Sequence, residues 1–114
     1  MSSSSTPLIK NAYWKGVAKT SSYAIQGQDI QCVFNNSNAT GAITLTLPKA
    51  APGLYFKFVV ATAHAITITP KISTDTIRGK SAGSSASNTT VGSFLSLICS
   101  IPGYWEPEIN IGSW

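Results

Sequence analysis

Few side chains in this sequence of 114 residues could carry acid–base or nucleophilic chemistry. The only histidine, His64, lies between alanines in a segment whose composition is typical of a loop. A serine–histidine–acid centre would place His64 beside an acid and a nucleophilic serine, but no nucleophile motif is present. The acids are Asp29, Asp75, Glu106 and Glu108. We therefore expect His64 to be an exposed loop residue.

Glu106 and Glu108 are the carboxylates whose spacing could suit glycoside hydrolysis. Alternate residues of a strand share a face and lie about 7 Å apart. Pro107 stands between them and cannot donate to a strand ladder, which favours an edge or bulged strand with solvated acids. We predict that the protein is not an enzyme.

Cofactor and metal sites are not predicted either. One histidine and two distant cysteines, Cys32 and Cys99, do not have the spacing of a metal-ligand set. Residues 79–81 (Gly-Lys-Ser) are similar to the end of a phosphate-binding loop but lack its upstream glycine. Both cysteines lie in apolar runs, so we expect buried thiols, although sequence alone leaves their pairing open.

The elements that must position these residues are strands. Apolar and polar residues alternate over residues 43–47, 54–60 and 66–69, a period of two that places the apolar residues on one buried face. Further strand-like runs lie near residues 30–34, 91–99 and 104–111. About seven short strands without a helical segment predict an all-β fold, either an antiparallel β-sandwich or a barrel-like fold.

Turn residues separate these runs. Residues 48–53 end in Pro-Gly and predict a turn, while residues 61–64 are short enough for a hairpin connection. Residues 79–90 have the composition of a flexible, exposed loop. The run over residues 91–99 is apolar on both faces, which is typical of a central strand or of one beneath an interface.

The N-terminal residues differ from the rest of the chain. We assign residues 1–22 to an extended arm and residues 23–114 to the folded domain. The arm is too poorly patterned to fold alone, and its aromatic residues favour burial against its own domain or a neighbouring subunit. The candidate contact residues are Leu8, Ile9, Lys10, Tyr13, Trp14 and Lys15, together with Trp114 at the C-terminus.

Composition favours protein–protein assembly. Charged residues make up 11% of the chain, against about 25% in typical soluble domains, and serine and threonine supply the polarity. Hydroxyl groups are cheaper to bury than charges. Three lysines without an acid in the first twenty residues are a weak footprint for nucleic acid, and no segment is apolar enough for a membrane helix or a signal peptide. We predict neither nucleic acid nor a membrane as a partner.

Exposed aromatic residues offer an alternative function. Tyr55 and Tyr104, with Trp105 and Trp114 nearby in the sequence, could form a platform on which sugars stack. The competing interpretation places Trp105 in the core and Trp114 against a neighbouring molecule. Tyr55 and Tyr104 remain the possible glycan contacts.

Several segments together resemble a β-rich module of tailed-bacteriophage virion proteins. A threonine-rich strand ends in Leu-Pro, a Pro-Gly-Leu-aromatic turn begins the next strand, and an Ile-Thr-Ile strand leads to Asp-Thr-Ile. A run of alternating apolar residues then precedes Gly-Tyr-Trp. These segments are residues 43–48, 51–60, 66–70, 75–77, 95–100 and 103–105.

The resemblance implies a fold of the jelly-roll or β-tulip type and a structural role in the virion. A short chain with its own methionine is more similar to a head decoration, or cement, protein than to a tail fibre. Such proteins bind the major capsid protein on the outer surface of the capsid, commonly as trimers. The resemblance therefore implies a homotrimer that stabilises the shell; a tail-fibre or receptor-binding module is the alternative.

Overall fold

The computed structural model describes residues 14–114 and shows an all-β protein with two sheets. A single 3-10 turn, η1 (Gly27–Asp29), is the helical element of this part of the chain. The six-stranded sheet contains, in spatial order, β1 (Lys15–Ala18), β3 (Cys32–Asn35), β5 (Tyr55–Val59), β9 (Phe94–Ile101), β10 (Tyr104–Ile111) and β7 (Thr76–Ile77). The four-stranded sheet contains β2 (Tyr23–Ala24), β4 (Ile43–Leu47), β6 (Ile66–Pro70) and β8 (Ala86–Asn88). The ten strands do not confirm the expected number of about seven.

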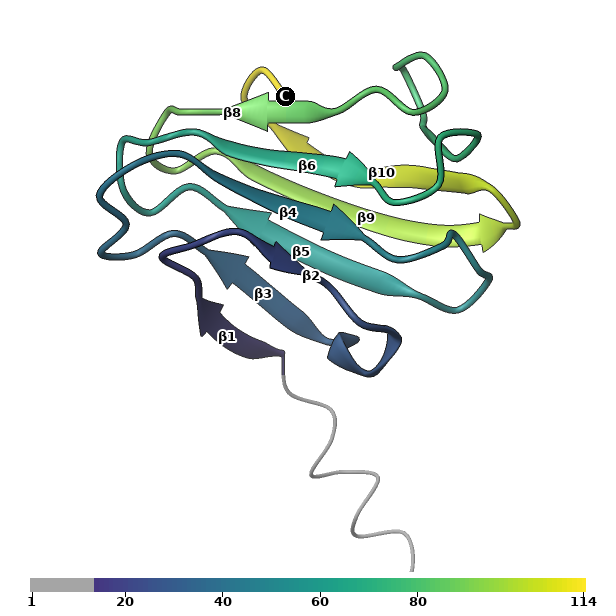
Figure 1. The fold of residues 1–114 in the computed structure, drawn as a ribbon, viewed down its shortest axis with the longest axis horizontal. Coiled ribbons are helices and arrows are strands. Elements are labelled where there is room, and N and C mark those ends of the chain that lie inside the picture. Colours follow the sequence, from purple (N-terminus) through teal and green to yellow (C-terminus); the bar gives the residue numbers. More distant parts are fainter. Residues whose placement is uncertain (1–13) are drawn as a thin grey trace, which may run out of the picture.

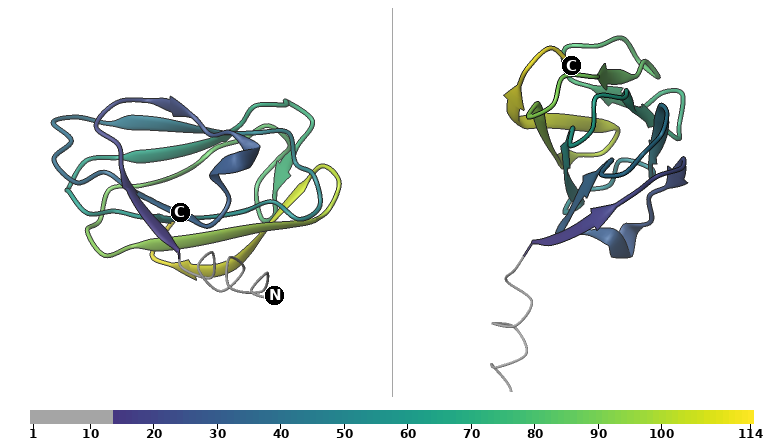
Figure 2. Two further views of the ribbon diagram at one scale, coloured as in Figure 1. Left: turned by 90° about the horizontal axis from the view of Figure 1, so that it is seen from below. Right: turned by 90° about the vertical axis from the view of Figure 1, so that its left-hand side faces the viewer.

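The two sheets form separate layers (Figures 1 and 2). The alternating runs predicted from sequence supply the core between them, because every second side chain of each strand points inward. β4 and β6 bury three positions each, and β5 buries both its phenylalanines. Large core side chains with less than 2% exposure are Phe34, Leu45, Leu47, Phe56, Phe58, Ile66, Ile68, Leu95, Leu97 and Trp105. The core position expected for Trp105 is therefore confirmed.

From β1 to β6 the chain winds as a coil, crossing from one sheet to the other after every strand. Successive turns stack in parallel: Tyr23 pairs with Leu45, and Ile43 pairs with Ile66. In Figure 1 these turns rise from β1 and β2 at the lower end of the molecule toward β5 and β6. One turn of the coil thus takes 22 or 23 residues at these pairs.

This topology corrects two predictions. The sheets are mixed rather than antiparallel, because β1–β3, β3–β5, β2–β4, β4–β6 and β7–β10 are parallel pairs. Residues 61–64 do not close a hairpin, since β5 and β6 lie in different sheets. A hairpin and an arch between sheets need the same inward-facing apolar residues, so the alternating pattern could not separate them.

The C-terminal half changes to antiparallel pairing. β9 pairs with β5 and β10 with β9, while β8 pairs with β6 at the edge of the other sheet. Two irregularities interrupt the β9–β10 ladder, one of them between Pro107 and Ile109. The bulged strand predicted from Pro107 is thereby confirmed, although β7 rather than β10 forms the edge.

Two segment assignments change in the structure. β8 lies within residues 79–90, which the sequence predicts as an exposed loop; Ala86 and Asn88 are buried there because they face the core side of the sheet. β1 lies within the segment assigned to the N-terminal arm and pairs with β3 through Val17 and Phe34, among other residues. Sheet structure in the described residues therefore begins at Lys15.

Candidate functional site

The outward faces of the two sheets differ in chemistry. On the four-stranded sheet, the residues that alternate with the core are hydroxylic, and they pair with one another across β4, β6 and β8. Thr67 and Ser87 also share a hydrogen bond of 3.1 Å. We call this surface the hydroxyl face; it consists of Thr44, Thr46, Thr67, Thr69 and Ser87. It is the polar outer face expected of a solvated sheet.

On the six-stranded sheet the outward residues are largely apolar. Residues paired across strands share a face, so the outward set follows from the register with Tyr55, Lys57 and Val59 of β5. We call this surface the contact face; it consists of Trp14, Val33, Tyr55, Lys57, Val59, Phe94, Ser96, Ile98, Glu106, Ile109 and Ile111. Ile98 is 38% exposed and Ile111 58% exposed. Such a patch on a sheet is typical of an interaction surface.

Trp14, the first described residue, is fixed on this face. Its ring meets the ring of Tyr55 edge-on, with centroids 5.3 Å apart. The Lys57 ammonium lies 4.1 Å from the centroid of the Trp14 ring. Both are favourable arrangements for an aromatic quadrupole. Trp14 therefore fixes the start of the described chain at the contact face.

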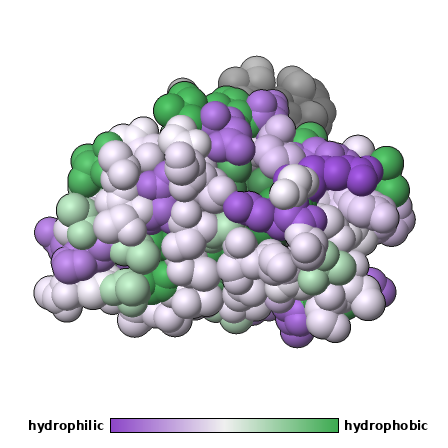
Figure 3. All heavy atoms as spheres, turned by 90° about the horizontal axis from the view of Figure 1, so that it is seen from above, coloured by the Kyte–Doolittle hydropathy of each residue, from purple (hydrophilic) through white to green (hydrophobic). Residues whose placement is uncertain are grey.

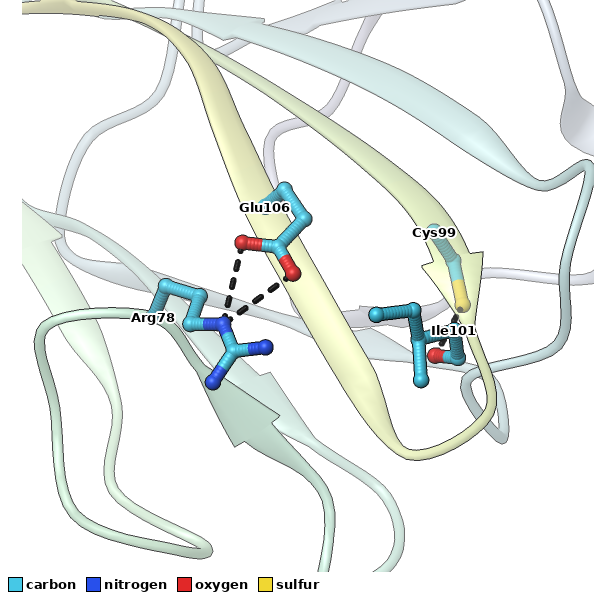
Figure 4. A network of polar contacts seen from close by, with 4 residues as sticks. All are labelled: Arg78, Cys99, Ile101 and Glu106. Atoms are coloured by element: carbon cyan, nitrogen blue, oxygen red, sulfur yellow. Dashed lines mark hydrogen bonds and ion pairs between the residues drawn. The ribbon is translucent and has the colours of Figure 1, made fainter.

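A second cluster lies along β10 and β7 (Figure 4). The Arg78 Nε atom donates to both carboxylate oxygens of Glu106 at 3.1 Å. The Arg78 guanidinium also lies 4.1 Å from the centroid of the Tyr104 ring. Figure 4 also shows a separate contact on β9, where the Cys99 thiol donates to the Ile101 carbonyl at 3.2 Å. Since the ion pair is substantially exposed, it holds the side chains in position more than it stabilises the fold.

The charges on and beside the contact face balance. Lys57 and Arg78 are opposed by Glu106 and Glu108, whereas the whole chain carries a net charge of +4. Glu108 accepts a hydrogen bond of 2.8 Å from Ser96, which places this carboxylate at the same face. The positive Lys57 lies on β5 and the negative Glu108 on β10, with β9 between them.

The structure describes only some of the predicted contact residues. Leu8, Ile9, Lys10 and Tyr13 lie outside residues 14–114. Trp14 lies on the contact face, and Lys15 is exposed on β1 at the edge of that sheet. Trp114 is partly buried against the protein's own core, and its indole Nε1 donates to the Ile111 carbonyl at 3.0 Å. Its predicted contact with a neighbouring molecule stays a prediction.

The two possible glycan contacts are on different strands. Tyr55 belongs to β5 and Tyr104 to β10, with β9 between them, so the strands are about 10 Å apart. Trp14 already contacts Tyr55, and the Arg78 guanidinium covers one face of the Tyr104 ring. A single sugar stacking on both rings is therefore disfavoured, because each ring is already in contact with a protein side chain.

His64 and Asp75, the groups considered for catalysis, lie in separate segments, and each takes part in a hydrogen bond. His64 lies in the arch between β5 and β6, where its carbonyl accepts a hydrogen bond from Asn36. It is partly buried, less exposed than the sequence predicts. Asp75 is buried and accepts a hydrogen bond of 2.8 Å from the Ala50 amide. Within residues 14–114, no three potential metal-ligating side chains come together.

Cys32 and Cys99 are buried, as expected, and the structure shows that they are unpaired. β5 lies between their strands, which puts their Cα atoms about 10 Å apart, beyond the reach of a disulfide. Burial is the main cause that raises the pKa of each thiol. Near neutral pH both side chains are therefore protonated and serve as small apolar groups in the core.

Sequence reasoning missed the apolar residues of the contact face, chiefly Ile98, Ile109 and Ile111. The signal was present at residues 91–99, whose two apolar faces predict either a central strand or an interface. β9 meets both descriptions, since it has a strand on each side and an exposed Ile98. The outward side of β10 was obscured by its bulges, which shift the alternation after Pro107.

The surface on the side of β8 and the C-terminus is mostly near-neutral in hydropathy, with scattered hydrophilic and hydrophobic positions (Figure 3). This agrees with the small charged fraction of the sequence. The one helical turn among residues 14–114 is too short to cross a membrane. In comparisons with known proteins, no protein-family model and no curated protein matches this chain.

Proposed function

We propose that this protein is a structural component of a tailed-bacteriophage virion, and more specifically a head decoration protein. The observation that supports this proposal is the difference between its two outer faces. One is hydroxylic, while the other carries exposed isoleucines, aromatic rings and balanced charges. A stable, largely neutral patch of this kind suits a lasting protein–protein contact.

In the proposed mechanism, the protein binds the assembled capsid shell and not its separate subunits. Binding of this kind stabilises the shell by mass action. Trp14, at the end of the arm, lies on the contact face. Leu8, Ile9, Lys10 and Tyr13 are the proposed contacts with the major capsid protein. The arm would order on binding, which costs entropy and calls for several apolar contacts.

Two finer assignments belong to the same proposal and rest on the resemblance to virion modules. The two-layered fold is assigned to the sandwich type, related to jelly rolls or β-tulips. Three copies would occupy a symmetry axis on the outer surface of the capsid. The assignment to this type requires that related virion modules contain the same parallel coil that β1 to β6 form here.

Electron microscopy of purified virions, labelled with an antibody against this chain, tests the proposal. Label on the head is expected; label on the tail would favour the fibre or receptor module, and unlabelled particles would contradict a virion role. Deletion of residues 1–13 should lower the occupancy of the shell, and this deletion spares β1. Glycan-array binding that is lost in Tyr55→Ala or Tyr104→Ala would support the alternative.

A further inference from the structure

The contact face has no covering element among residues 14–114. β1, β3, β5, β9, β10 and β7 form its floor, and the second sheet lies on the opposite side (Figure 2). Four of the eight exposed large hydrophobic residues belong to this face: Trp14, Ile98, Ile109 and Ile111. The hydroxyl face, built by the same kind of alternating strands, has no comparable residue. An apolar outward set restricted to one sheet indicates a partner for that sheet.

We propose that further copies of this chain cover the contact face, with the β5 side of one copy packed on the β10 side of the next. The charges on and beside the contact face indicate which partner covers it. A face with two cations and two acids does not favour a strongly charged partner such as nucleic acid or an acidic protein. A second copy, in contrast, brings the same apolar residues and the matching charges.

The position of the charges sets the arrangement. Lys57 and Glu108 flank Ser96 of β9 near the middle of the face: Lys57 pairs with Ser96 from β5, and Glu108 accepts its hydrogen bond from β10. When the β5 side of one copy meets the β10 side of the next, Lys57 approaches Glu108 of the neighbouring molecule. A packing of β5 sides on each other would bring lysines together, and like charges at an interface are unfavourable.

The dimensions of the face allow a small protein–protein contact. β9 and β10 have eight residues each, which gives a length of about 26 Å at about 3.3 Å per residue. The other four strands of this sheet are shorter, with two to five residues, so the strands of the face cover a flat area of about 490 Å² at about 4.8 Å between strands. Each partner of a standard interface contributes roughly 800 Å². Nearly the whole face must therefore be used, including the Trp14 and Tyr55 rings.

Analytical ultracentrifugation of the full chain at micromolar concentration tests this inference. We expect a mass that is a multiple of the chain, and Ile98→Glu should weaken association by about tenfold or more, because it places a charge in the centre of the interface. Thr67→Glu is the matched control on the hydroxyl face and should leave association unchanged. A monomeric full chain, or equal association of the wild type and Ile98→Glu, would overturn the proposal.

Charge exchange tests the packing of β5 on β10. Lys57→Glu and Glu108→Lys should each weaken association, and the double variant should recover most of the loss. Failure of the double variant to recover would contradict this arrangement, provided that circular dichroism shows all three variants folded. These measurements use the purified chain alone, so their outcome is independent of whether it binds a capsid.

Discussion

Asn36 hydrogen-bonds to both backbone groups of Thr62. Its Nδ2 donates to the Thr62 carbonyl at 3.0 Å, and its Oδ1 accepts from the Thr62 amide at 2.9 Å. The same side chain binds the Ala61 amide and the His64 carbonyl. Asn36 is fully buried at the end of β3, so it fastens the arch that carries the chain from β5 to β6. One side chain thus satisfies four backbone groups that no strand ladder reaches.

Replacement of Asn36 by alanine should therefore destabilise the protein strongly. Four backbone groups would lose a partner, and we expect the free energy of unfolding to fall by about 2–4 kcal/mol. Urea titrations monitored by fluorescence measure this change. Asn110→Ala, at an exposed position of β10, is the control and should change stability by less than about 0.5 kcal/mol. Similar values for both variants would show that the arch does not depend on Asn36.

Gly53 should resist substitution although space is available around it. Its φ of +98° favours glycine, and a Cβ atom would meet nothing within 4 Å. Gly53→Ala should therefore cost about 1–3 kcal/mol through backbone strain alone. Gly16 in β1 has equal space and no positive φ, so Gly16→Ala should be neutral or slightly stabilising. Since neither added methyl group would meet another atom, a difference in thermal unfolding between the two variants measures the backbone strain at Gly53.

Tyr23 should make stability depend on alkaline pH. Its hydroxyl donates to the Asp29 carboxylate at 2.7 Å, and this hydrogen bond is the main cause that raises the pKa of Tyr23 above its usual value near 10. The folded state holds this proton more tightly than the unfolded chain. The stabilising contribution is thus present below pH 10 and is lost as pH rises through the folded-state pKa.

Comparison of the wild type with Tyr23→Phe isolates this effect from the other groups that titrate at high pH. Unfolding free energies from about pH 8 to about pH 11 should fall more steeply for the wild type than for the variant. At neutral pH the variant should be the less stable of the two, because Asp29 loses a donor. Parallel pH profiles would mean that the hydrogen bond does not contribute to stability.

The thiols of Cys32 and Cys99 should react slowly in the native protein. Both are buried, and burial raises the pKa of each, so neither supplies an accessible thiolate near neutral pH. Labelling with a thiol reagent should be slow without denaturant and complete in urea, with two thiols titrated per chain. Rapid native labelling would indicate that β3 or β9 opens readily, since these strands carry the two cysteines.

The candidate surface was only partly predictable from sequence. The pattern over residues 54–60 assigned Tyr55, Lys57 and Val59 to an outward face, and the structure confirms that alternation. It could not show that Trp14 would lie against Tyr55. The start of β1 comes near β5 only because β1 pairs with β3 and β3 pairs with β5. The β10 residues were less predictable still, since a bulge reverses which side chains point outward.

Local patterning by itself determined that the chain forms strands, which residues of β4, β5 and β6 are buried, and that Pro52-Gly53 and Pro107 interrupt the strands. These features depend on the two-residue period of a strand and on the backbone limits of proline and glycine, all of which act within a few residues. The tertiary structure decided which strands are neighbours. An arch and a hairpin bury the same side chains, so only the packing of whole strands selected the parallel coil, and with it the one sheet whose outer face is apolar.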